Sequence, residues 1–364
     1  MRKQQRKLSF LIIIALVIVM LASSVMVASP ADSQNPALST KPSIPQPTTD
    51  PTVPTATDPT VPTGTTPTSE PTQPSQPTET TAPTTPTAPS EPTKPTEPEG
   101  PSLQSRDAFV YDCRTGKFLF TTGDIHDKLY VASITKLYTA YVALLYLKPT
   151  DIVTVGNILD TLPSDSSIAL LNPKDKLSVA DLILGMLLPS GGDAARVLAV
   201  AAGKAYLGTT DETEYYYYEA FVREMNRQAQ LLGMNDSNFK NPDGYHDPDH
   251  YMSLADAARL GELCLTSSRI MESMQTKVYT AIVHNTARDI LWTNTNKLIF
   301  QDRYPEFYHP QAVGGKTGYT SAAGNCLLST FMVEDGYLII GAFGSETRDG
   351  RFNDTLKLFK YVDA

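Results

Sequence analysis

The segment from about residue 32 to residue 102 most constrains what this chain can fold into. Most of the 28 prolines of the chain lie in it, separated largely by threonine and serine. A Thr-Asp-Pro-Thr-Val-Pro-Thr run begins at Thr49 and again at Thr57. Because such a composition offers almost nothing to bury, we predict that residues 32–102 stay extended and belong to no core.

The segment before it, residues 1–31, is either a secretory signal peptide or an N-terminal membrane anchor. Four basic residues lie within the first seven positions and precede an uncharged apolar run over residues 8–28. That length matches a bilayer span better than a signal core, although small residues near its end permit cleavage. The basic end stays in the cytoplasm, so we expect everything after residue 30 to lie outside the membrane.

Residues 32–102 then predict a disordered stalk, with an untethered tail as the alternative. At about 3.1 Å per residue, an extended segment of this length could reach on the order of 200 Å. The remaining residues, 103–364, are enough for one large folded domain. The formal net charge of −9 offers no basic stripe, so we expect no nucleic-acid partner.

Residues 103–364 carry strand signals at both ends and helix signals between them. We expect a hairpin over 108–113 and 118–121, short extended pieces at 152–155, 170–171 and 177, a strand opening near 318, and strands over 326–333 and 337–343. We expect helices over 132–147, 182–188 (after a capping box at 178–181), 193–202, 221–232, 254–265 and 351–361. This order predicts an α/β (α+β) fold whose first and last strands pair around a helical insertion.

Ser133 and Lys136 open the apolar run over residues 132–147. On a helix, residues three apart lie on one face, so the Ser133 hydroxyl can meet the Lys136 amine. Serine becomes a nucleophile when a neighbouring base takes its proton, and burial can lower the pKa of a lysine enough for that role. The alternative is an N-capping serine beside a lysine that extends to the surface.

Two later pieces of sequence complete a candidate site. Ser190 lies in a Pro-Ser-Gly-Gly break between two predicted helices, where its hydroxyl can project into a cleft. Lys316-Thr317-Gly318 opens a predicted strand, where lysine and threonine offer donors to a carboxylate and glycine allows a substrate backbone to approach.

These motifs, in this order and at these distances, resemble the serine D-alanyl-D-alanine carboxypeptidases, the low-molecular-mass penicillin-binding proteins. The likeness extends from about Asp107 to Tyr361 and includes the further runs Leu188–Ala195, Leu232–Asn235, Phe239–Gly244, His250–Asp256 and Gly315–Thr320. It implies the fold shared with serine β-lactamases, an antiparallel sheet flanked by helices with a helical subdomain.

By this resemblance, Ser133 is acylated, Lys136 accepts its proton, and Ser190 relays protons to the leaving D-Ala. The backbone N–H of Ser133 also helps to hold the oxyanion. The implied substrate is a peptidoglycan stem peptide, β-lactam antibiotics are implied covalent inhibitors, and no cofactor or metal is implied. The residues implied to bind substrate are Lys316, Thr317, Gly318 and Tyr319, with the last supplying a second backbone N–H to the oxyanion.

The sequence departs from the family pattern at position 192. The second motif of the family is Ser-x-Asn, and this chain has Gly192 instead, which we expect to affect acylation more than folding. Asp193 or a water could partly replace the missing amide. Many family members also carry a β-rich C-terminal domain and an amphipathic membrane helix, whereas this chain continues for only 46 residues after Gly318. We expect the N-terminal segment to take over the tethering.

Other interpretations stay open at this point. His246, Asp247, Asp249 and His250 could suggest zinc, but neighbouring Pro and Gly residues favour a turn. Tyr215–Tyr218 could form a carbohydrate-stacking surface, or more simply an approach to the helix over 221–232. The three cysteines contain no Cys-x-x-Cys pair, and we expect Cys113 and Cys326 to be buried free thiols.

Two alternative functions also stay open. No Glu-x-x-Leu-Asn stretch lies between Ser190 and Lys316, which argues against a class A β-lactamase. A wall-binding scaffold that has lost activity is supported only by Gly192.

Overall fold

The computed structural model describes residues 100–363, all within one compact unit. The predicted anchor and almost all of the predicted stalk lie outside the described residues. None of the helices in the described part is both long and apolar enough to cross a bilayer.

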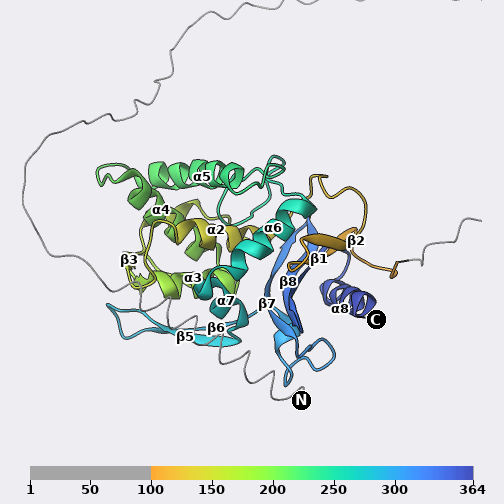
Figure 1. The fold of residues 1–364 in the computed structure, drawn as a ribbon. Helices are drawn as coiled ribbons and strands as arrows, with labels where there is room; N and C mark the ends of the chain where they lie inside the picture. Colours follow the sequence, from red (N-terminus) through yellow and green to blue (C-terminus); the bar gives the residue numbers. More distant parts are fainter. Residues whose placement is uncertain (1–99, 364) are drawn as a thin grey trace, which may run out of the picture. The chain divides into compact units, whose positions relative to one another are not determined.

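A five-stranded antiparallel sheet forms one half of this unit, in the order β2-β1-β9-β8-β7 (Figure 1). Its strands are β1 (Asp107–Asp112), β2 (Lys117–Thr121), β7 (Ala312–Thr320), β8 (Gly324–Val333) and β9 (Gly336–Ser345). The predicted hairpin and the pairing of the first and last strands are confirmed, because β1 lies between β2 and β9.

Alternation along β1 explains why both faces of this sheet are covered. Ala108 and Val110 join a cluster with α8 (Gly350–Val362), whereas Phe109 between them belongs to the larger core on the opposite face. Helix α6 (Leu254–Leu265), as predicted from the sequence, packs on that opposite face (Figure 1).

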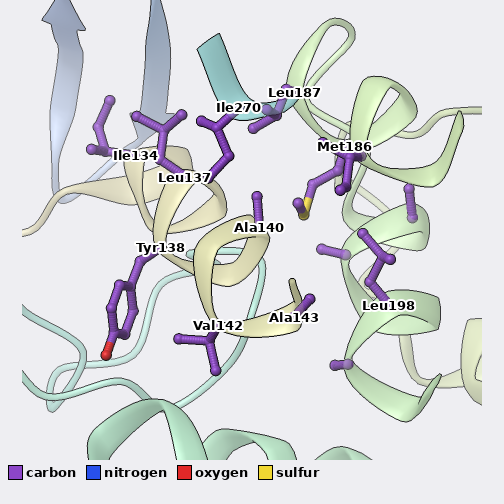
Figure 2. Close-up of a cluster of buried hydrophobic side chains, with 14 of the residues drawn as sticks. Ile134, Leu137, Tyr138, Ala140, Val142, Ala143, Met186, Leu187, Leu198 and Ile270 are labelled. Atoms are coloured by element: carbon purple, nitrogen blue, oxygen red, sulfur yellow. The ribbon is translucent and has the colours of Figure 1, made fainter. Parts of the chain in front are cut away.

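The helical insertion between β2 and β7 is built around α2 (Thr135–Ala143), which is preceded by the 3₁₀ turn η1 (Ala132–Ile134). Seven of the nine residues of α2 are fully buried, and side chains such as Leu137 and Ala140 face Met186, Leu198 and Ile270 on surrounding helices (Figure 2). The helices around it are α3 (Val179–Leu187), α4 (Gly192–Leu207), α5 (Glu214–Leu231) and α7 (Ser268–Gln275).

Several predicted boundaries were wrong. The helix expected over 132–147 ends at Ala143, a few residues before Pro149 interrupts the chain. Residues 170–171 form no strand, because Leu170 has a positive φ of 63°. Helix α5 begins at Glu214, so Tyr215–Tyr218 lie within the helix instead of leading to it.

The capping box at Ser178 is confirmed. Two small sheets complete the insertion, one of β3 (Ile152–Thr154) with β4 (Lys176–Ser178), the other of β5 (Val278–Ile282) with β6 (Asp289–Thr293). The second sheet and α7 were not predicted. No Gly or Pro marks the connection between β5 and β6, so the sequence gives little sign of a hairpin there.

The start of the described chain is held against α8 by one buried carboxylate. Asp354 accepts hydrogen bonds from the Gln104 and Ser105 backbone N–H groups at 2.8 and 2.7 Å, and from the Ser105 hydroxyl at 2.8 Å. Lys357 adds a bond to the Ser102 carbonyl oxygen at 2.8 Å. Residues 102–105 are therefore part of the folded unit.

Candidate active site

Ser133 lies in the η1 turn, directly against strand β7. Ala132 before it has a φ of 48°, a conformation that non-glycine residues rarely adopt and that is often found at functional sites. A Cβ atom on Gly318 would lie 2.8 Å from the Val131 carbonyl oxygen and 3.1 Å from the Ser133 backbone nitrogen. Only glycine therefore lets the strand come so close to the turn that presents Ser133.

Lys136 lies one turn further along, with its side chain almost fully buried. Its Nζ donates to Ser133 Oγ at 3.0 Å and to the Asp243 carbonyl oxygen at 2.5 Å. Burial lowers the pKa of Lys136 to about 8, against the opposing effect of the Asp243 and Asp193 carboxylates. A usable fraction of Lys136 is therefore neutral near physiological pH and faces the Ser133 hydroxyl.

Ser190 lies in the predicted break between α3 and α4, with a positive φ of 67°. Its hydroxyl accepts a hydrogen bond from Lys316 Nζ at 2.9 Å, and the same amine donates to the Thr317 carbonyl oxygen at 2.9 Å. Lys316 is fully buried, which lowers its pKa well below the usual value, and the nearby cations of Lys136 and Arg351 act in the same direction.

A cavity of about 630 Å³ brings the sequence-predicted residues together. Lys316 is not part of its lining and reaches it through the hydrogen bond to Ser190. Thr317 shares a hydrogen bond of 2.7 Å with the hydroxyl of Thr295, whereas the Tyr319 side chain is largely exposed at the rim. The predicted residues in the lining are Ser133, Lys136, Ser190, Thr317, Gly318 and Tyr319.

Sequence reasoning missed Arg351 as a residue of this cavity. Arg351 comes from the first turn of α8, and its Nη1 donates to the Gly318 carbonyl oxygen at 2.9 Å. Its Nε is buried and has no hydrogen-bond partner among residues 100–363. Burial lowers its pKa to about 10, so the guanidinium remains a cation behind β7 at neutral pH. An arginine at the start of a surface helix carries no signal that would have identified it.

His250 supports the strained turn and forms no part of a zinc site. Its Nδ1 accepts from the Lys240 backbone N–H at 3.2 Å, which leaves Nε2 to donate to Thr135 Oγ1 at 2.8 Å. Thr135 in turn donates to the Ala132 carbonyl oxygen at 2.9 Å. Burial lowers the pKa of His250 to about 4, so the ring is neutral at pH 7.

The other residues of the suspected zinc cluster form the predicted turn, closed by a bond from the His250 N–H to the Asp247 carbonyl oxygen at 2.9 Å. Within residues 100–363, no three His, Cys, Asp or Glu side chains gather closely enough to hold a metal ion. Cys113 and Cys326 are free thiols as predicted, although Cys113 is only half-buried, and Cys264 is also free and buried.

Asp193 does not replace the amide that position 192 lacks. Its carboxylate accepts hydrogen bonds from the backbone N–H groups of Ala169 at 2.7 Å, Leu171 at 3.1 Å and Ala194 at 2.9 Å. It thereby fixes the loop over residues 165–171 and makes no hydrogen bond to Lys136. Of the two alternatives that the sequence left open, partial replacement of the amide by Asp193 or by a water, the hydrogen bonds of Asp193 argue against the first.

Comparisons with known proteins identify the family of this chain. A family model described as D-alanyl-D-alanine carboxypeptidase matches residues 93–347. The chain belongs to the D-alanyl-D-alanine carboxypeptidase family. Among its relatives in this family, DacC of Escherichia coli is 30% identical over 271 residues, and DacF of Bacillus subtilis is 28% identical over 262 residues. These alignments cover 72% and 71% of this chain but only 62% of each relative.

Solved structures of the family share the fold predicted from the sequence. The DD-transpeptidase of Streptomyces K15 superposes with a TM-score of 0.65 and 26% identity, over 72% of this chain and 98% of that chain. Penicillin-binding protein D2 of Listeria monocytogenes, solved with ampicillin bound, gives a TM-score of 0.58 and 25% identity over the same shares.

The His250–Thr135–Ala132 hydrogen bonds yield a stability prediction. Thr135→Val leaves the buried His250 N–H without a partner, and the Ala132 carbonyl oxygen keeps only the bond from the Thr135 backbone N–H, so we expect a loss of about 1–3 kcal/mol in the free energy of unfolding. Urea unfolding followed by circular dichroism measures it.

Thr139→Val is the matched control for this substitution. Thr139 is equally buried one turn later on α2 and donates to the Pro242 carbonyl oxygen at 2.7 Å, so its replacement removes this one hydrogen bond, whereas Thr135→Val removes two and leaves a buried N–H without a partner. Equal losses in the two variants would contradict the supporting role of His250.

Proposed function

We propose that this chain is a serine-type D-alanyl-D-alanine carboxypeptidase that removes the terminal D-Ala of peptidoglycan stem peptides through an acyl-enzyme on Ser133. The observation that carries the proposal is the buried amine of Lys136, 3.0 Å from the Ser133 hydroxyl at the wall of the cavity. The names of the relatives in this family support the choice of substrate.

The chemistry follows from the neutral form of Lys136. The amine takes the Ser133 proton as Oγ attacks the carbonyl carbon of the last peptide bond, which becomes a tetrahedral oxyanion. The backbone N–H groups of Ser133 and Tyr319 hold that oxyanion, and loss of one such donor typically costs about 3 kcal/mol in transition-state stability.

Collapse of this intermediate breaks the peptide bond. The proton returns through Ser190 to the departing D-Ala amine, and water then hydrolyses the Ser133 ester.

A cluster of positive charge explains why the scissile bond would be the last one in the peptide. Lys316 and Arg351 are both buried around β7, and Thr317 presents its hydroxyl to the cavity. A free α-carboxylate placed there would be attracted by both cations, and its own charge would favour the protonated form of Lys316. A peptide without a terminal carboxylate would lose this attraction.

β-Lactam antibiotics are the proposed covalent inhibitors, because their ring amide presents a carbonyl carbon to Ser133 while their carboxylate would occupy the place of the terminal carboxylate near Thr317. No Glu-x-x-Leu-Asn stretch lies between Ser190 and Lys316 to activate a deacylating water. We therefore expect the acyl-enzyme formed with a β-lactam to persist. The relative solved with ampicillin bound supports penicillin binding as a property of the family.

The first test of the function is labelling with a fluorescent penicillin followed by measurement of D-Ala release from a pentapeptide. We expect the wild-type protein to be labelled and to release D-Ala, and Ser133→Ala to do neither, because the attacking oxygen is gone. Ser268→Ala, an exposed serine on α7, is the control that keeps both activities. Absence of labelling in the wild type would favour the inactive scaffold, whereas labelling without D-Ala release would point to another peptide substrate.

The pH dependence tests Lys136 as the base. Below its pKa of about 8 the lysine is mostly an ammonium ion and cannot accept a proton. We therefore expect the acylation rate constant to rise with pH and to level off above about pH 8, with a tenfold fall for each pH unit well below the midpoint. A stopped-flow or gel-based rate profile measures this, and a rate that is flat up to pH 10 would contradict the role.

We further propose that residues 1–31 remain as an N-terminal membrane anchor and that residues 32–102 form a stalk, which places the catalytic domain on the extracytoplasmic face of a bacterial membrane. The basic start followed by the uncharged run over residues 8–28 supports this. Such a place would suit a role in cell-wall maintenance and cell shape.

N-terminal sequencing of the protein recovered from membranes is the test of the anchor. We expect the uncleaved terminus, because the apolar run is long enough to span the bilayer. A mature terminus near residue 28 would instead indicate secretion after signal cleavage.

A further inference from the structure

A buried ion pair lies directly behind Lys136. Arg196 on α4 donates from Nε to Asp243 Oδ2 at 2.8 Å, and the two side chains are only 9% and 3% exposed. Taking two charges out of water is costly, and many such pairs could be replaced by apolar residues without loss of stability. The pair therefore calls for a reason beyond stability.

Asp243 joins this pair to Lys136 through its backbone. Its carbonyl oxygen accepts the 2.5 Å hydrogen bond from Lys136 Nζ, and its second carboxylate oxygen accepts from the Tyr245 backbone N–H at 2.9 Å. Arg196 is itself fixed, because its Nη1 donates to the carbonyl and hydroxyl oxygens of Thr161 at 2.9 and 2.7 Å. The carbonyl that receives Lys136 cannot turn without breaking this set of bonds.

Gly192 lies next to the same carboxylate, at a position where a side chain would require the flexible end of Leu162 to move. A Cβ at position 192 would lie 3.7 Å from Asp243 Oδ2 and 3.0 Å from Leu162 Cδ1. A longer side chain there would therefore meet the oxygen that Arg196 already binds. Position 192 and Arg196 compete for one partner, and this chain has the arginine.

We propose that Arg196 and Asp243 act together as positioning residues that hold Lys136 against Ser133, in place of a side chain at position 192. This inference rests on the proposed function, because it gives Lys136 a task to be positioned for. Arg196 touches neither Ser133 nor Lys136 through a hydrogen bond, so it acts through Asp243.

The two members of the pair act on Lys136 with opposite signs. The Arg196 cation lowers the pKa of Lys136, and the Asp243 carboxylate raises it. Removal of the Arg196 charge should therefore raise the pKa of Lys136, and removal of the Asp243 charge should lower it. The other titratable or charged groups around Lys136 are Asp193 on α4, His250 in the loop between α5 and α6, and Lys316 on β7.

The experiment measures the pH midpoint of Ser133 acylation by a fluorescent penicillin in single variants. We expect Arg196→Met to raise the midpoint and Asp243→Asn to lower it, each by roughly one pH unit. Arg227→Met is the control, since it removes an arginine from the ion pair with the buried Glu224 on α5 and should leave the midpoint unchanged. Shifts in the same direction, or no shift in either variant, would overturn the proposal.

A rescue variant separates positioning from a merely structural role. Asn introduced at position 192 can donate its amide to the Asp243 carboxylate once Arg196 is gone. We expect the double variant with Arg196→Met and Gly192→Asn to be acylated at least tenfold faster than Arg196→Met alone. Gly192→Asn by itself should bring no gain over the wild-type protein. Equal effects in both backgrounds would overturn the competition between the two positions.

A direct titration keeps the inference testable if the proposed function fails. The ¹³Cε resonance of Lys136, assigned by its loss in Lys136→Arg, reports the protonation of the amine without any substrate. If penicillin does not label the wild-type protein, the proposed function is refuted. Even then, titration midpoints of this resonance that shift in opposite directions in Arg196→Met and Asp243→Asn would support the positioning pair. Titration midpoints that stay unchanged in both variants would refute the positioning pair.

Discussion

The burial of one amine, that of Lys136, is the constraint on which the rest of the site depends. In water the pKa of this lysine would be near 10.5, and its amine would be almost fully protonated at neutral pH. Helix α2 removes it from water because it lies at the centre of the insertion, enclosed by the helices around it. The neighbouring carboxylates of Asp193 and Asp243 limit the shift, so the pKa stays close to neutral pH.

Backbone strain on both sides of the cavity helps to present the hydroxyls of Ser133 and Ser190. Ala132 and Ser190 both have positive φ, and a residue held in such a conformation typically costs about 1–3 kcal/mol. Each is over-determined by its neighbours, since the His250–Thr135 bonds hold the Ala132 carbonyl and the buried Lys316 holds the Ser190 hydroxyl. The core of the helical insertion and the sheet thus offset the cost of presenting two hydroxyls to one cavity.

The sequence predicted the parts of the site that are local in the chain. Ser133 and Lys136 could be paired from helical spacing, and the Pro-Ser-Gly-Gly run indicated that Ser190 lies in a break between helices. The positions of Arg351 and Asp243 could not be predicted, because each reaches the cavity through packing between elements more than 100 residues apart from Ser133. The sequence left Asp193 open as a partial replacement for the amide missing at position 192, until its carboxylate proved to be bound by three backbone N–H groups.

Local signals also explain which parts of the fold were missed. The strands around the Asp335–Gly336 turn were predicted because their apolar runs are long and the turn is distinctive, whereas β5 and β6 are short, half-exposed and joined without glycine. Helix α2 begins later than predicted because residues 132–134 form the η1 turn against β7, and it ends early as the chain approaches Pro149. Such packing is decided by contacts distant in sequence.

The clamp at Asp354 has a mechanical consequence. Any pull on the chain ahead of residue 102 acts on the hydrogen bonds between residues 102–105 and α8 before it reaches β1. The same helix carries Arg351 one turn earlier, with its guanidinium bonded to the Gly318 carbonyl. A single helix therefore both holds residues 102–105 and positions a cation of the cavity, so tension that displaced α8 would also move the Arg351 guanidinium away from the strand beside Ser133.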